Sequence, residues 1–77
     1  KELYANDFNW VSIEEPKEEI RCKARIRYNQ KEQPATAKAM EDGKVKVTFD
    51  ESQRAICKGQ AVVLYDGDVV LGGGTIL

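Results

Sequence analysis

Apolar and polar residues alternate with a period of two through much of this chain, a pattern typical of half-buried β-strands. Residues 20–28 show it most clearly, because apolar and cationic side chains take turns there without a break. One face of this segment would carry Ile20, Cys22, Ala24, Ile26 and Tyr28, and the other would carry Arg21, Lys23, Arg25 and Arg27. The pattern predicts a strand over residues 20–28 with a row of cations on its outer face.

A β-hairpin is predicted near the C-terminal end. The apolar runs 61–65 and 69–71 flank Asp66 and Gly67. This pair suits the positive φ angles of a two-residue type I′ turn. The cross-strand pairs that such a turn sets are Tyr65 with Asp68, Leu64 with Val69, Val63 with Val70, and Val62 with Leu71.

Both faces of this predicted hairpin are apolar. One face would carry Val62, Leu64, Val69 and Leu71, and the other Ala61, Val63 and Val70. A hairpin on a protein surface normally has one polar face. We therefore expect this hairpin to lie centrally in a barrel or sandwich, or to use its second face on a partner outside the chain.

Weaker patterns complete the predicted fold. Residues 10–13, 35–40 and 45–49 are expected to be strands, with a hairpin turn at Asp42 and Gly43 between the last two. A single helical turn is expected at residues 50–54, with Asp50 as its cap. Six short strands without a long amphipathic helix predict an all-β fold, a small antiparallel barrel or sandwich.

Composition limits the classes of function. The 77 residues form one small domain, and 12 basic against 13 acidic side chains give a net charge of −1. The charge is segregated, because residues 1–19 are mainly acidic and residues 20–31 contain only basic charges. No apolar run approaches the ~20 residues of a membrane helix. Two distant cysteines build neither a disulfide framework nor a metal site, so a cytoplasmic origin is expected. The start at Lys1 and the apolar end suggest a piece of a longer protein.

Catalysis by this chain alone is not expected. It has no histidine, the commonest general base and metal ligand. Cys22 alternates with core residues and is expected to be a small apolar filler. The basic neighbours of Cys57 favour a lower thiol pKa, but a reactive role is the minor reading. Residues 72–74 are all glycine, which favours a bent strand over a phosphate-binding loop because no helix follows.

The predicted cationic row has two readings. Side chains two apart on a strand lie ~6.6–6.8 Å from each other, close to the phosphate spacing of a nucleic-acid strand. Lys44 and Lys46 on another strand would widen such a surface, with Lys31, Arg54 and Gln60 at loop positions. The alternative is that these charges merely solvate an outer strand and pair with the glutamates of the preceding loop.

A series of short segments resembles the C-terminal domain of the bacterial tRNA-specific 2-thiouridylases, which have also carried a methyltransferase name. The matching segments, in order, are residues 26–28 (Ile-Arg-Tyr), 33–36 (Gln-Pro-Ala-Thr), 47–51 (Val-Thr-Phe-Asp-Glu), 53–56 (Gln-Arg-Ala-Ile), 59–63 (Gly-Gln-Ala-Val-Val), 65–67 (Tyr-Asp-Gly) and 71–74 (Leu-Gly-Gly-Gly). The likeness runs from about residue 6 to residue 76, and the ordered series is more specific than any one segment.

The resemblance implies a small six-stranded antiparallel β-barrel, similar to barrels of translation factors, that helps to hold tRNA. In that family an N-terminal ATP-pyrophosphatase domain, which uses ATP and Mg, adenylates the wobble uridine. Two cysteines outside the barrel deliver the sulfur. Neither Cys22 nor Cys57 takes over that role, so residues 1–77 are expected to be a noncatalytic C-terminal domain of a transferase.

The expected partners are the anticodon region of tRNA and the N-terminal and central domains of the parent chain. Candidate tRNA-binding residues are Arg21, Lys23, Arg25, Arg27, Tyr28, Arg54 and Gln60. The last four belong to the matched segments, whereas the first three are proposed from the alternating pattern alone. Tyr28 could equally belong to the core, because it shares a face with Ile26. The alternative function is a structural module that docks on other domains without touching RNA.

Overall fold

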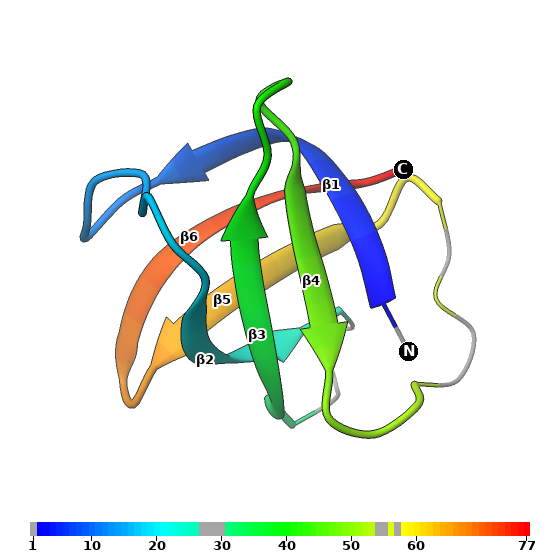
Figure 1. The fold of residues 1–77 in the computed structure, drawn as a ribbon. Coiled ribbons are helices and arrows are strands. Elements are labelled where there is room, and N and C mark those ends of the chain that lie inside the picture. The colour runs from blue at the N-terminus through cyan, green and yellow to red at the C-terminus, as the bar shows by residue number, and fades with distance from the viewer. Residues whose placement is uncertain (1, 27–30, 54–55, 57) are drawn as a thin grey trace.

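Six antiparallel strands close into a barrel in the computed structural model (Figure 1). The structure describes residues 2–26, 31–53, 56 and 58–77. The strands are β1 (Glu2–Trp10), β2 (Ile20–Arg25), β3 (Gln33–Ala39), β4 (Val45–Phe49), β5 (Ala61–Asp66) and β6 (Val69–Ile76). Their order around the barrel is β1-β4-β3-β2-β5-β6. The predicted all-β class and the antiparallel six-stranded barrel are confirmed.

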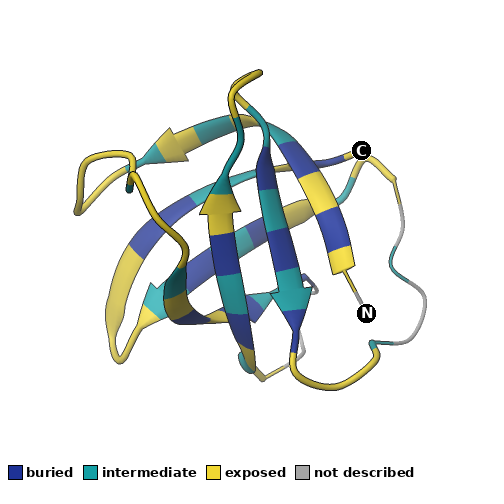
Figure 2. Cartoon of the chain, viewed as in Figure 1, coloured by how far each residue is buried: buried dark blue, intermediate teal, exposed yellow. Residues whose placement is uncertain are grey.

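The barrel interior is filled by one face of every strand. Along β4, Val45, Val47 and Phe49 are buried and the residues between them are partly exposed, which gives the banded pattern of Figure 2. A six-stranded barrel is narrow, so large side chains must face small ones. Most of the small buried side chains come from β2 and β3, namely Cys22, Ala24, Ala35 and Ala37, and β1 adds Ala5.

The strand predicted for residues 10–13 is wrong, because the first strand lies earlier and runs from Glu2 to Trp10. Its inward residues, Leu3 and Ala5, pair with Val47 and Val45 of β4. After Trp10 the chain bends, since the amides of Val11 and Ser12 both donate to the carbonyl of Leu71. A second amide on the same acceptor cannot continue a ladder.

A β-bulge in β1 explains the glycines of β6. Two residues, Asp7 and Phe8, lie opposite the single Gly74 in the β1–β6 ladder, and Asp7 has a φ of 51°. Such a bulge bends the strand and redirects its side chains. The Phe8 ring packs against two glycines of β6. A Cβ added to Gly72 would lie 2.9 Å from one ring carbon of Phe8, and a Cβ added to Gly74 would lie 2.7 Å from another. The glycines therefore let β1 lie closer to β6 than residues with a Cβ would allow.

The C-terminal hairpin is confirmed, but its predicted turn and register are wrong. Asp66 still pairs, with Val69, so the turn residues are Gly67 and Asp68. Gly67 has a φ of 60° whereas Asp68 has no positive φ, and this matches a type II′ turn, which takes glycine at its first central position. A bulge after Leu64 then shifts the partner of that residue to Gly72.

The shifted register changes which apolar residues are outside. Val62, Leu64 and Leu71 are buried as predicted, but Val69 is 51% exposed instead of sharing their face. Val70 is 40% exposed. The hairpin therefore has an apolar tip that the described part of the chain leaves uncovered.

Other strand bounds also differ from the sequence prediction, since β3 begins at Gln33 and β6 continues to Ile76. β2 ends at Arg25 and Ile26 follows it as a buried residue outside the strand, while Arg27 and Tyr28 are outside the described residues. Residues 50–53 form no helical turn. The hairpin between β3 and β4 is confirmed, with Gly43 at a φ of 86°. Within the described ranges, no helix has the length and apolar character needed to cross a membrane.

Candidate nucleic-acid interface

The cationic row of β2 points outward as predicted for its three described members. Cys22 and Ala24 are buried, so the alternation of the strand places Arg21 and Lys23 in solvent and leaves Arg25 half-buried. Three of the candidates, Arg27, Tyr28 and Arg54, lie outside the described residues. The candidate interface is therefore built from Arg21, Lys23, Arg25 and the strands beside them.

Arg21 is held by a carboxylate. Its two terminal nitrogens donate to the two carboxylate oxygens of Asp50, each at 2.8 Å, and one also donates to the Thr36 hydroxyl at 3.0 Å. The hydrogen bonds and the charge of Asp50 raise the pKa of Arg21. A bidentate pair of this kind fixes the guanidinium and cancels its charge. Arg21 thus joins β2, across β3, to the residue that follows β4.

The two lysines of the β4 segment also have carboxylate neighbours. Lys44 lies 3.0 Å from Asp42, and this lysine lowers the pKa of Asp42 by hydrogen bonding and charge. Lys46 lies 3.3 Å from Glu2. Each pair is exposed and worth little in stability, but it reduces the local positive charge. The predicted widening of the cationic surface over this strand is therefore weak.

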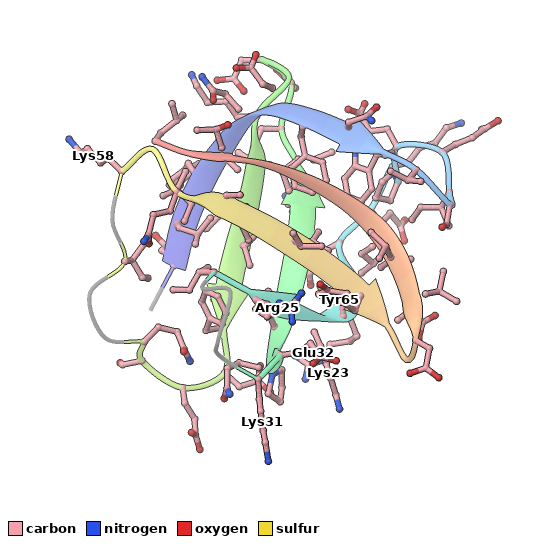
Figure 3. All side chains as sticks on the ribbon, turned by 180° about the vertical axis from the view of Figure 1, so that it is seen from behind. Lys23, Arg25, Lys31, Glu32, Lys58 and Tyr65 are labelled. Atoms are coloured by element: carbon pink, nitrogen blue, oxygen red, sulfur yellow. The ribbon has the colours of Figure 1, made fainter. Side chains whose placement is uncertain are left out.

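Arg25 has a different partner, the phenol of Tyr65 on the neighbouring strand β5. Its Nη2 donates to the Tyr65 hydroxyl at 2.6 Å, and its guanidinium carbon lies 5.3 Å from the centre of the ring. Figure 3 shows the two side chains pointing toward each other between β2 and β5. No carboxylate of the described chain forms an ion pair with Arg25 or Lys23. The positive charge of β2 is therefore concentrated at these two residues.

Tyr65 is a site residue that the sequence did not reveal. The predicted hairpin register placed it opposite Asp68, and nothing in the sequence indicated that β5 would pair with β2. In the structure its Cα partner on β2 is Lys23. The one sequence feature that could have indicated its role is that Tyr65 is an aromatic residue at an outward position of a strand.

Gln60 and Lys58 are not brought together with this cluster. Gln60 precedes β5 and Tyr65 is near the other end of that strand, so about 16 Å of extended chain separates them. Figure 3 shows Lys58 at the upper left edge of the molecule, away from Arg25. Lys31, in contrast, extends from the same side as Arg25. The candidate interface is thus the outward surface of β2 and β5 around Lys23, Arg25 and Tyr65.

The sequence of this barrel matches a known protein family over nearly its whole length. The family model described as "Aminomethyltransferase beta-barrel domain" matches residues 1–76 of this chain. The chain belongs to this family. The relatives of this barrel domain include tRNA-specific 2-thiouridylase MnmA 1 of Thermoanaerobacter sp. (strain X514), which is 57% identical over 75 residues. The tRNA-specific 2-thiouridylases MnmA of Acetivibrio thermocellus and Clostridioides difficile are 55% and 53% identical, each over 76 residues.

These alignments cover 97–99% of the barrel domain but only 21% of each relative. The chain therefore spans about a fifth of the length of the curated relatives that it matches. The resemblance to the C-terminal barrel of tRNA-specific 2-thiouridylases, predicted from the sequence, is confirmed.

The barrel domain shows little catalytic chemistry in its described residues. Burial raises the pKa of the Cys22 thiol to about 11, so it stays protonated near pH 7 and cannot act as a nucleophile there. The apolar-filler role predicted for Cys22 is consistent with its place in the core. Cys57 is outside the described residues. In the described ranges, no three histidine, cysteine, aspartate or glutamate side chains gather as a metal site.

Proposed function

We propose that this barrel contacts tRNA for a 2-thiouridylase whose active site lies in other domains. In this proposal the barrel holds the anticodon region of tRNA. A separate N-terminal domain of the parent protein uses ATP and Mg to activate the wobble uridine, and the reaction takes place in the cytoplasm. The relatives of the barrel support this proposal, because they are tRNA-specific 2-thiouridylases. The fold and the chemistry of the described residues suit a binding domain better than a catalytic one.

The main observation behind this proposal is a pair of positive charges on β2 that have no carboxylate partner in the described chain and lie beside the aromatic ring of Tyr65. Lys23 and Arg25 are cations without a carboxylate partner in the described chain, and Tyr65 lies next to both on β5. Proteins hold RNA backbones with lysine and arginine and often add aromatic side chains. Of the other outward cations on or beside β2, β3 and β4, those at positions 21, 44 and 46 are paired with carboxylates, whereas Lys38 of β3 is exposed and has no ion pair in the described chain.

Titration of labelled tRNA with the 77-residue chain tests this function. With two or three phosphates contacted, the plot of log K against log salt should have a slope of about −1.4 to −2, and Kd at moderate salt should be ~10⁻⁴ to 10⁻⁶ M. Fluorescence anisotropy at several salt concentrations measures both values. An unchanged anisotropy at high micromolar protein and low salt would contradict a role in RNA binding.

A second candidate function is docking on other domains of the parent chain. An uncovered apolar surface favours it, because Val11, Ile13, Val69 and Val70 are all exposed, and hydrogen bonds hold residues 11 and 12 against residues 70 and 71. Apolar patches of this kind often mark interfaces. If docking is the only function, the same titration shows no tRNA binding, and sedimentation detects self-association of the isolated chain.

A further inference from the structure

The charge of Arg25 is fixed in place without being neutralised. Its hydrogen-bond partner is a neutral phenol, in contrast to Arg21, whose partner is the carboxylate of Asp50. A guanidinium has five N–H donors, and the contact with Tyr65 uses one of them. Because the side chain is half-buried and already ordered, binding an anion there loses less conformational entropy than at a mobile lysine.

The Tyr65 hydroxyl is set up to act with Arg25 on the same ligand. It accepts the Arg25 hydrogen bond at 2.6 Å and still has its own proton to donate. A guanidinium and a hydroxyl side by side present two kinds of donor to one group of acceptor oxygens. The phosphate group of a nucleic acid has such oxygens and one negative charge.

Lys23 provides a second cation at a suitable spacing. It precedes Arg25 by two residues on β2, so the two side chains leave the strand ~6.6–6.8 Å apart on the same face. Lys23 is also the Cα partner of Tyr65, which keeps all three residues in one small area. Two consecutive phosphates of one strand would match this arrangement.

The charged surroundings favour a phosphodiester over a more highly charged anion. Gln33 pairs with Ala24 in the antiparallel β2–β3 ladder, so Glu32, the residue before Gln33, lies on the side of Arg25. No ion pair joins Glu32 to Lys23 or Arg25 in the described chain. Figure 3 shows its side chain in the same region as Lys23. A carboxylate at the rim opposes a dianion more than a monoanion.

We propose that Lys23 and Arg25 bind two consecutive phosphates of an RNA strand. Tyr65 orients the Arg25 side chain and donates a hydrogen bond to the phosphate that Arg25 binds. Arg21 has a structural role and does not bind RNA. This inference rests on the proposed tRNA-binding function and adds to it a specific pair of contacts.

Replacement of the Tyr65 hydroxyl tests the inference. Tyr65→Phe keeps the ring and every charge, so we expect affinity for labelled tRNA to fall about 5- to 10-fold with an unchanged salt slope. Lys23→Gln should instead make the slope shallower by about 0.7, because one phosphate contact is lost. Tyr4→Phe is the matched control, since Tyr4 is an exposed tyrosine on β1, and it should bind like the unsubstituted chain.

The possible failures of these measurements can be told apart. If Tyr65→Phe binds as tightly as the unsubstituted chain while Lys23→Gln weakens binding, Tyr65 does not position Arg25 and the inference is wrong, although the barrel still binds RNA. If the unsubstituted chain does not bind tRNA, the proposed function itself fails. Circular dichroism melting of each variant shows that the barrel is folded in the assay.

Discussion

Gly72→Ala is expected to destabilise the barrel by about 3 kcal/mol, the upper part of the usual range for overpacking. A Cβ at this position would lie 2.5 Å from the Asn9 carbonyl oxygen, 2.9 Å from Phe8 Cε1 and 3.1 Å from the Trp10 Cα. The oxygen and the Cα belong to the backbone of β1, so relief requires β1 to move away from β6. For a domain of this size the loss corresponds to a fall in Tm of about 15 °C or more.

Thr75→Ala is the control for this prediction. Thr75 lies on the same strand and is exposed, so its truncation should change stability by less than about 0.5 kcal/mol. Thermal unfolding followed by circular dichroism measures both variants. Equal melting temperatures for Gly72→Ala and Thr75→Ala would show that β1 does not lie as close to β6 as described.

The double variant Lys23→Gln, Arg25→Gln is expected to bind tRNA about 100-fold more weakly than the unsubstituted chain. A hydrogen bond to a charged group contributes about 1.5 kcal/mol or more, and two such contacts are removed. Both side chains point away from the core, so the barrel should remain folded. Anisotropy titration at low salt measures the loss.

Lys44→Gln, Lys46→Gln is a matched control because it removes the same amount of charge from another part of the barrel. These lysines lie beside Asp42 and Glu2, so we expect less than a threefold change in tRNA affinity. A similar loss in both double variants would mean that only the net charge of the domain matters. It would contradict a localised site on β2 and β5.

The sequence predicted the strands whose alternation is directly visible. In β2 and β4 every inward residue is apolar and nearly every outward residue is charged or polar, so local pattern and burial agree. β1 was misplaced for a physical reason. A bulge at Asp7 and Phe8 breaks its period of two, and its apolar face includes the small Ala5 and the partly buried Phe8.

The hairpin register shows a second limit of local pattern. The sequence Asp66-Gly67-Asp68 permits two neighbouring turns, and the choice depends on packing across the barrel. The bulge after Leu64 lets both Leu71 and Gly72 be buried, and Gly72 must then accommodate Phe8 of β1. These requirements come from distant segments, so the residues of the turn alone do not reveal the register.

The sequence predicted the direction of the β2 cations but not their partners. The outward direction of Arg21, Lys23 and Arg25 follows from alternation alone. Their partners do not, because Asp50 lies 29 residues from Arg21 and Tyr65 lies 40 residues from Arg25. Only the barrel order, which places β2 between β3 and β5, decides that Arg21 is paired with a carboxylate and Arg25 with a phenol.

Two-dimensional ¹⁵N–¹H NMR of the 77-residue chain during addition of tRNA would show which face of the barrel binds. We expect the largest shifts at the amides of Lys23, Arg25 and Tyr65 and at the Arg25 Nε–H. We expect little change at Lys44, Lys46 and the exposed tip around Val69. Shifts confined to that tip or to the β4 lysines, or none at all, would contradict an RNA-binding face on β2 and β5.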